Sequence, residues 1–379
     1  MINTSDVDAS IAFARSGRYD ALPTRRVIWG DGCRNQLPTE LSQHGASRVL
    51  LLTTESLTRQ AEYVQQIVDL LAERHIATID SLPAHVPAQA LDTAWTGIAK
   101  ARPDLIVAFG GGSVIDAAKA IAARSRETFD HAPDIIALPT TLSGAEYAHV
   151  YGVLEDGDHG PYKRTYIDPE ITPRIVFLDP ALTLATPSRL WLSSAIKALD
   201  HAIEGFLQPG ERPITDILAL VGIRRLANAL CDQNPLDTSV RLAAQIASWM
   251  CYFAPATSRT GLSHRIGYVL GGYYQVPHSL TSCFTLAPVL DSYSTLEPDK
   301  LTAISSALGG RSAQGCSSAE LMAGLVSQLG LPHRLRDAGV AADEIPRIAM
   351  LVRHHFPQDC VRTDSLGPDT FDQLIRSLW

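Results

Sequence analysis

The 379-residue sequence lacks the features that mark several classes of protein. Its six cysteines form no Cys-x-x-Cys pair, which argues against a disulfide framework or a structural zinc module. No run approaches the roughly 18 apolar residues of a membrane span, and the N-terminal segment has no apolar secretory core. The net charge of −8 comes without a long basic run, which argues against a nucleic-acid or membrane surface. These absences predict a cytoplasmic protein that binds a small molecule.

The hydrophobic content of 46% is enough for a large core, and the length suggests about two domains. Short apolar runs alternate with helical stretches in the first half, which predicts βαβ units and a mostly parallel sheet. The expected strands are 47–54, 75–82, 104–113 and 134–141, and the expected helices are 57–74 and 87–101. Beyond residue 187 the periodicity is helical. We therefore predict an α/β domain over residues 1–182 and an all-helical domain over residues 183–379.

A glycine-rich turn follows one predicted strand. Gly110, Gly111, Gly112 and Ser113 lie between the apolar run LIVAF and a stretch with helical spacing. Glycines allow close backbone approach, and free N–H groups at a helix start attract an anion such as a pyrophosphate. Packing alone also explains such turns, and this one is neither GxGxxG nor a Walker loop. From the spacing alone, both interpretations stay open.

Four motifs occur in an order that resembles the iron-containing alcohol dehydrogenase superfamily. They are GGGSVIDAAKA, LPTTLSGAE at 138–146, the helix containing HAIE, and GLSHRIGYVLGGYYQVPH at 261–278. The segments YGVLEDGDHGPYKRTYIDPEITPRIVFLDPALTLATP and GLPHRLRDAGV resemble its maleylacetate reductase branch. The resemblance implies an NAD(P)-dependent oxidoreductase with a Rossmann-like N-terminal domain, an all-α C-terminal domain and a cleft between them. It also implies the dehydroquinate synthase-like fold and a homodimer.

The resemblance also assigns a cofactor site to the α/β domain. By position, residues 110–113 would hold the pyrophosphate of NADH or NADPH, and Asp116 belongs to the same set. Thr140, Thr141 and Ser143 would line the groove beside the adenine and the nicotinamide. Thr54 stands where many relatives carry an aspartate that contacts the adenosine ribose, so NADPH stays possible beside NADH.

The metal site of the iron-type relatives has changed in this sequence. Those relatives share an Asp-x-x-x-His helix and two later histidines fourteen residues apart. Here His201, His264 and His278 keep that pattern, while Lys197 replaces the aspartate. An ammonium about 5 Å from a divalent ion would repel it by roughly 6 to 7 kcal/mol at a dielectric of ~20. Asp200 points about 100° away from its neighbour His201, which makes it a poor substitute ligand.

We therefore predict that no metal is bound, as in maleylacetate reductases, although these usually carry an uncharged residue at that position. A carbonyl that accepts hydride develops negative charge on oxygen, which iron-type enzymes meet with a Lewis acid. We hypothesise that Lys197 supplies this positive charge. His201, His264 or Tyr268 would deliver the proton, and His278 would orient the substrate. Proton transfer from Lys197 itself, or a Schiff base on it, is an alternative.

Three cations are candidates for a substrate carboxylate: Lys163 and Arg164, in a segment like the KRT of the maleylacetate reductase branch, and Arg265 beside His264. Solvated surface cations explain the first two equally well. The predicted function is a metal-independent NAD(P)H-dependent reductase of a small oxo-acid or conjugated carbonyl, and these cations would suit a substrate that carries a carboxylate. Three alternatives stay open: a zinc or iron alcohol dehydrogenase with three histidine ligands, a non-redox lyase or cyclase, and an inactive binding protein.

Overall fold

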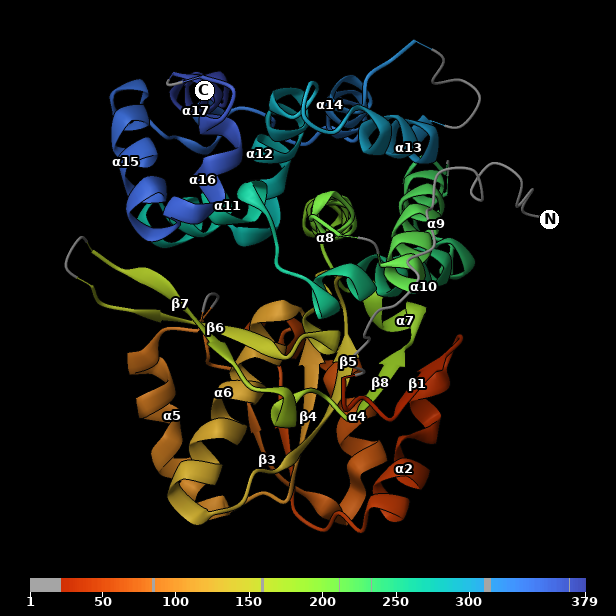
Figure 1. The fold of residues 1–379 in the computed structure, drawn as a ribbon. Coiled ribbons are helices and arrows are strands. Elements are labelled where there is room, and N and C mark those ends of the chain that lie inside the picture. Colours follow the sequence, from red (N-terminus) through yellow and green to blue (C-terminus); the bar gives the residue numbers. More distant parts are fainter. Residues whose placement is uncertain are drawn as a thin grey trace. The chain divides into compact units, whose positions relative to one another are not determined.

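The computed structural model describes residues 22–83, 86–157, 160–210, 212–232, 234–309, 315–367 and 369–379. These residues divide into two compact units, drawn as ribbons in Figure 1. The first unit contains residues 22–187 and Asn234–Ile246, and the second contains Ser188–Gln233 and Ala247–Trp379. No helix among the described residues has both the length and the apolar character needed to cross a membrane.

A six-stranded parallel sheet forms the centre of the first unit, with the order β1-β8-β5-β4-β2-β3. The strands are β1 (Arg26–Trp29), β2 (Val49–Leu52), β3 (His75–Ile79), β4 (Leu105–Gly110), β5 (Asp134–Pro139) and β8 (Ile175–Leu178). Strands β2, β4 and β8 are buried along their whole length, which explains why they appear in the sequence as continuous apolar runs. The predicted parallel α/β fold is confirmed.

Helices cover this sheet, with α2 (Leu37–His44) and α4 (Ala61–Leu71) packed on one face. There, Leu41 and Ile67 join Leu51 and Phe109 in one buried cluster. Helices α5 (Ala88–Ala101) and α6 (Gly112–Phe129) lie on the other side of the sheet in Figure 1. The short helices are α3 (Glu55–Thr58) and α7 (Pro180–Thr183).

An antiparallel hairpin of β6 (Val150–Glu155) and β7 (Tyr162–Ile167) was not expected from the sequence. Strand β7 is only partly buried and carries charged residues, so it has no apolar run to mark it. The segment Asn234–Ile246 also belongs to this unit, because the Arg241 guanidinium donates to the Thr183 carbonyl at 2.9 Å.

The second unit is helical, and no strand occurs among its described residues. It contains α8 (Ser188–Leu207), α9 (Pro213–Leu230), the end of α10 (Thr238–Thr257), α11 (Leu262–Tyr273), α12 (His278–Ser292), α13 (Pro298–Gly309), α14 (Ser318–Gln328), α15 (Ile345–His355), α16 (Pro357–Asp364) and α17 (Thr370–Ser377). Helix α8 packs against α9, α11 and α12, and its residues from Ser193 to Leu207 are all buried. The all-α prediction for this half is confirmed.

Candidate functional site

The glycine turn in the α/β unit leaves no room for side chains. Gly110 has a φ of +157°, and a Cβ there would lie 2.6 Å from Cγ2 of Val114. Only glycine adopts that backbone without strain. Helix α6 begins two residues later, so its first N–H groups lie at the carboxyl end of strand β4. In parallel α/β sheets this edge is where ligands bind.

A second predicted segment lies against this turn. A Cβ on Gly111 would be 3.0 Å from Cγ2 of Thr141, and a Cβ on Gly112 would be 2.9 Å from Oγ of Ser143. The Thr140 N–H also donates to the Gly110 carbonyl at 3.0 Å. The fold therefore brings together the phosphate turn, which includes Ser113, and the Thr140–Ser143 loop. Two segments thirty residues apart thus lie side by side at the carboxyl end of β4.

The other two predicted cofactor residues have structural partners. Thr54 follows β2, the neighbour of β4, and its hydroxyl accepts from the Leu57 N–H at the start of α3. Asp116 accepts from the Gly152 N–H at 3.3 Å and lies 3.4 Å from Nζ of Lys163. Asp116 therefore anchors the β6–β7 hairpin to α6.

The two cations predicted on that hairpin are both paired within the α/β unit. Lys163 faces Asp116, as described, and Arg164 lies 3.4 Å from Oε2 of Glu155. The Arg164 guanidinium also lies over the ring of Tyr166, 5.1 Å from its centroid. Each cation thus has an acidic partner on or beside the hairpin.

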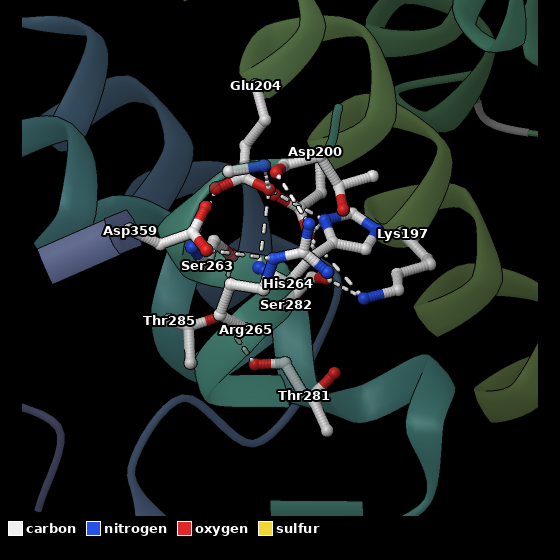
Figure 2. A network of polar contacts seen from close by, with 12 residues as sticks. Lys197, Asp200, Glu204, Ser263, His264, Arg265, Thr281, Ser282, Thr285 and Asp359 are labelled. Atoms are coloured by element: carbon white, nitrogen blue, oxygen red, sulfur yellow. Dashed lines mark hydrogen bonds and ion pairs between the residues drawn. The ribbon is translucent and has the colours of Figure 1, made fainter. Parts of the chain in front are cut away.

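The second cluster of functional groups lies inside the helical unit, on α8. Lys197, Asp200 and Glu204 are spaced three and four residues apart, so they share one helix face. All three are buried, with at most 3% of each residue exposed. Buried charges need partners, and Figure 2 shows that they find them in each other and in α11 and α12.

Glu204 caps helix α11 from outside that helix. Its Oε1 accepts from the Ser263 N–H at 2.6 Å, and its Oε2 accepts from the Gly261 and His264 N–H groups at 2.9 and 3.2 Å. The first N–H groups of a helix have no partner within the helix, and a carboxylate there also meets the positive end of the helix dipole. The burial of this acid is therefore compensated.

His264 lies between two carboxylates. Its Nδ1 is 2.7 Å from Oε2 of Glu204 and 3.0 Å from Oδ2 of Asp200. Burial disfavours the imidazolium, but Asp200 and Glu204 outweigh it and raise the pKa of His264. The other ring nitrogen, Nε2, is buried and has no hydrogen-bond partner among the described residues. His264 can therefore be protonated on both ring nitrogens, and the N–H at Nε2 then remains available to donate a hydrogen bond.

Lys197 completes the charge pairing. Its Nζ donates to Oγ of Ser282 at 3.1 Å and lies 3.6 Å from Oδ2 of Asp200. Ser282 in turn donates to that same oxygen at 2.5 Å. Burial alone would raise the pKa of Asp200, but His264, Lys197 and Ser282 hold it well below its usual range. A chain of contacts thus runs from Lys197 through Asp200 to His264.

His201 lies beside this chain in a neutral state. Its ring stacks on His264, with centroids 4.7 Å apart and planes 26° apart, and Tyr252 meets it edge-on at 5.1 Å. Burial, followed by the charges of His264 and Lys197, lowers the pKa of His201 well below 6.5. Its Nδ1 is also buried with no partner among the described residues. Two stacked imidazoles therefore each present an unused nitrogen.

The remaining predicted residues lie on the neighbouring helices. Tyr268 is one turn beyond His264 on α11, and His278 is the first residue of α12. Their rings stack with centroids 5.8 Å apart and planes 18° apart. All five predicted catalytic residues thus belong to α8, α11 and α12 of one unit.

Asp200, Glu204 and His264 also offer one donor atom each within 4.8 Å of one another, a spacing at which metals bind. Some of these atoms are engaged, because Nδ1 of His264 contacts both carboxylates, Oδ2 of Asp200 accepts from Ser282, and Glu204 accepts from backbone N–H groups. Oδ1 of Asp200 and Nε2 of His264 have no hydrogen-bond partner among the described residues. A divalent ion that binds Nδ1 of His264 would displace the proton on that nitrogen, beside the ammonium of Lys197. The same three residues therefore form an internal ion cluster and are also a candidate metal site.

Three members of the cluster, Asp200, Glu204 and Ser282, were not predicted as site residues, and Asp200 was expected to be a poor ligand. The i, i+4 spacing of Asp200 and Glu204 was a usable signal, because it places two carboxylates on one face of the histidine helix. Ser282 follows His278 at the same spacing, but a serine in an apolar helix carries little information by itself.

Comparison with known proteins assigns both halves of the chain. Residues 23–180 match the family described as iron-containing alcohol dehydrogenase. Residues 192–364 match the C-terminal domain of the Fe-containing alcohol dehydrogenase family. Maleylacetate reductase of Pseudomonas aeruginosa is 31% identical over 328 residues, which cover 86% of this chain and 88% of that protein.

Solved structures agree with this assignment. Maleylacetate reductase from Agrobacterium tumefaciens is similar with a TM-score of 0.79 and 26% identity, covering 96% of this chain and 97% of that one. The iron-containing alcohol dehydrogenase from Corynebacterium glutamicum gives a TM-score of 0.80 and 26% identity, with 97% and 96% covered. The similarity extends over both units.

Proposed function

Because the chain belongs to the iron-containing alcohol dehydrogenase superfamily, in its maleylacetate reductase branch, we propose that it reduces a small oxo-acid or conjugated carbonyl. It is an NAD(P)-dependent oxidoreductase, as its family indicates. Maleylacetate, after which the relatives are named, is the first substrate to test.

The cofactor proposal rests on the α/β unit. The amides at the start of α6 and the hydroxyls of Thr141 and Ser143 suit a pyrophosphate, since helix starts and backbone N–H groups bind phosphate oxygens. At the end of β2, Thr54 provides no carboxylate, and Glu55 is paired with Arg59 at 2.7 Å. A 2′-phosphate would therefore meet no dedicated acid there, so we propose that both NADH and NADPH serve.

We further propose that the reaction needs no resident metal, with Lys197 supplying positive charge in its place. A divalent ion would bring two positive charges to the carboxylates of Asp200 and Glu204. The ammonium of Lys197 and the imidazolium of His264 provide the same two charges at 3.6 and 2.7 Å. This charge balance is the observation that carries the proposal, because buried carboxylates are stable only when compensated.

In this scheme the hydride passes from the reduced nicotinamide to the substrate, and the electron pair of the carbonyl moves onto its oxygen. The ammonium of Lys197 and the N–H donor of His264 stabilise that oxygen. Nε2 of His264 then delivers the proton, because carboxylates keep its other nitrogen bonded and its pKa raised. His201, which is neutral, accepts a hydrogen bond from the substrate, and His278, whose ring stacks on Tyr268, orients the substrate.

The test follows absorbance at 340 nm for the full chain with NADH or NADPH and maleylacetate, with a chelator and again with added Zn²⁺ or Fe²⁺. Cofactor oxidation that is indifferent to the chelator supports the metal-free reductase. Oxidation that requires added metal favours a metal-dependent alcohol dehydrogenase, with Asp200, Glu204 and His264 as the candidate ligands in place of the three histidines. No oxidation under any condition overturns the maleylacetate assignment.

We also propose, from the family resemblance, that the chain acts as a homodimer and binds neither nucleic acid nor membrane. Light scattering coupled to size exclusion tests the dimer directly. A monomer that retains full turnover at nanomolar concentration contradicts it.

A further inference from the structure

We propose that Arg265 recognises a carboxylate of the substrate, an inference that rests on the proposed function and specifies its substrate class. Arg265 follows His264 directly on α11, within the helical unit. Its side chain is 15% exposed, so the charge is largely withdrawn from bulk water but still reachable. A guanidinium in that state can pair strongly with a carboxylate, because its fork of N–H donors matches the two oxygens.

Aromatic rings hold the guanidinium in place. Its Cζ lies 5.2 Å from the ring centroid of Phe356 and 5.8 Å from that of Tyr268, one turn along α11. Tyr268 in turn stacks on His278. Contacts of this kind fix a planar cation without using its N–H donors. Arg265 is therefore packed beside predicted catalytic residues with its hydrogen-bonding capacity kept for another partner.

The hydrogen bonds of Arg265 within the described residues are weak. Its Nε lies 3.4 Å from Oδ2 of Asp359, whereas a charged hydrogen bond measures about 2.7 to 2.9 Å. This Nε is buried and has no hydrogen-bond partner among the described residues. Its Nη2 has only a contact of 3.5 Å to the Thr260 carbonyl. A guanidinium offers five N–H donors, and unfilled buried donors carry a free-energy cost. A carboxylate would fill two of them at once.

The local charge also favours an anion. Asp359 lies 3.4 Å from Arg265 and 3.9 Å from Nη2 of Arg259, so one carboxylate faces two guanidinium groups. Figure 2 shows the contact between Arg265 and Asp359 beside the His264 cluster. The hairpin cations differ, because Lys163 and Arg164 each face an acid of their own. A substrate carboxylate would balance the surplus positive charge at Arg265.

Equilibrium binding of succinate tests the proposal, because this dicarboxylate cannot be reduced by the enzyme. Calorimetry at low ionic strength would compare the full chain with Arg265→Met, Arg265→Lys and Arg259→Met. Arg259 is the matched control, because its side chain is 66% exposed beside the same acid. We expect Arg265→Met to weaken succinate binding by about 10- to 100-fold, Arg265→Lys to weaken it less, and Arg259→Met to change it by less than about threefold.

Equal succinate binding by Arg265→Met and the unaltered chain would overturn the proposal, as would equal losses at Arg265 and Arg259. Turnover separates the proposal from the function on which it rests. Where maleylacetate is reduced, Arg265→Met should raise its KM while leaving kcat/KM for its dimethyl ester unchanged. Where no carbonyl is reduced, the proposed function fails, and the calorimetric comparison still decides whether Arg265 binds a carboxylate.

Discussion

Glu204 and His264 are joined twice, by a side-chain contact of 2.7 Å and by the acceptance of the His264 N–H at 3.2 Å. One carboxylate thus sets both the start of α11 and the charge of the imidazole on it. The two effects are separable by experiment, because only the second depends on pH in the neutral range.

The variant Glu204→Gln keeps the shape of the side chain and removes its charge. Because Glu204 helps to raise the pKa of His264, the variant should lose the protonated imidazole at a lower pH. Turnover that needs the protonated form falls as pH rises through that pKa, so the falling limb of the kcat profile should move to lower pH. At pH 8 we expect a loss of about 10- to 100-fold in kcat.

Glu320→Gln is the control for loss of a helix cap. Glu320 completes the capping box of α14 in the same unit but lies on the surface. Its replacement should leave the profile unchanged. If the falling limb of the kcat profile does not shift in Glu204→Gln, His264 is not the proton donor.

Replacement of Lys197 by aspartate should create a metal site. The change removes the ammonium beside Asp200 and places another carboxylate on the same helix face. Without metal, the added buried charge should lower stability by about 3 to 5 kcal/mol. Added Zn²⁺ should restore much of that stability and remain bound at about one ion per chain after dialysis.

Thermal unfolding with and without Zn²⁺, together with elemental analysis, measures both effects. Lys197→Met is the comparison, because it removes the ammonium without adding a ligand, and it should bind zinc more weakly. The charge argument fails where the unaltered chain gains as much stability from zinc as Lys197→Asp does.

Helices α8 and α10 meet at Gly205, where a Cβ would lie 2.4 Å from Cβ of Ala254. Gly205→Ala should therefore destabilise the helical unit by about 1 to 3 kcal/mol through overpacking. Gly97 on α5 has no atom within 4 Å of the same added carbon, and Gly97→Ala should stabilise by about 0.5 to 1 kcal/mol. The midpoint of unfolding in guanidinium chloride should therefore fall for Gly205→Ala and rise for Gly97→Ala. Adding Ala254→Gly should rescue Gly205→Ala, and failure of that rescue would contradict the contact.

Glu146 in the α/β unit gives a pH signature of stability. Burial raises its pKa from 4.5 to about 7, and its Oε2 has no partner among the described residues. Between those values the unfolded chain has released the proton and the folded chain keeps it. Stability should therefore fall as pH rises from 4.5 to 7, by up to ~3 kcal/mol, and then level off.

Burial lowers the pKa of the neighbouring Lys119 from 10.5 to about 8, so this group stays mostly charged in both states across that range. Urea unfolding of Glu146→Gln should lack the fall that the unaltered chain shows between these pH values. If the stability of both proteins falls equally with pH, a group other than Glu146 titrates in this range.

Gly112→Ala tests the cofactor surface, since its added carbon would lie 2.9 Å from Oγ of Ser143. We expect NADH binding, followed by cofactor fluorescence, to weaken by about tenfold or more because the phosphate amides move. Combination with Ser143→Ala should recover part of the loss. Binding unaffected by Gly112→Ala would exclude this turn as the phosphate site.

Part of this fold follows from the sequence alone. Strands such as β4 are buried on both faces, so they appear as apolar runs that end in glycine, and the parallel sheet follows from their alternation with helices. The β6–β7 hairpin has no such run, and β1 is exposed at both ends and only partly buried between them. Short or exposed strands are defined by their partners, which lie far away in the sequence.

The candidate site could likewise be predicted only in part. The spacing of Lys197, His201 and His264 indicated one cluster, but the sequence does not show where the ammonium points. Its partner Ser282 is 85 residues away, and only the packing of α12 against α8 brings the two together. The capping role of Glu204 likewise depends on how α11 approaches α8 in space.

The pairing of β1 with β8 has a consequence for the synthesis of the protein. Arg26 pairs in register with Ile175, so a growing chain carries β1 for about 150 residues before its neighbour in the sheet exists. At roughly 5 to 20 residues per second, a ribosome needs on the order of 10 to 30 seconds for that interval. Throughout it, β1 has no strand beside it, because β8 is its neighbour in the sheet. Nascent chains are therefore most exposed to aggregation before residue 178 has left the ribosome.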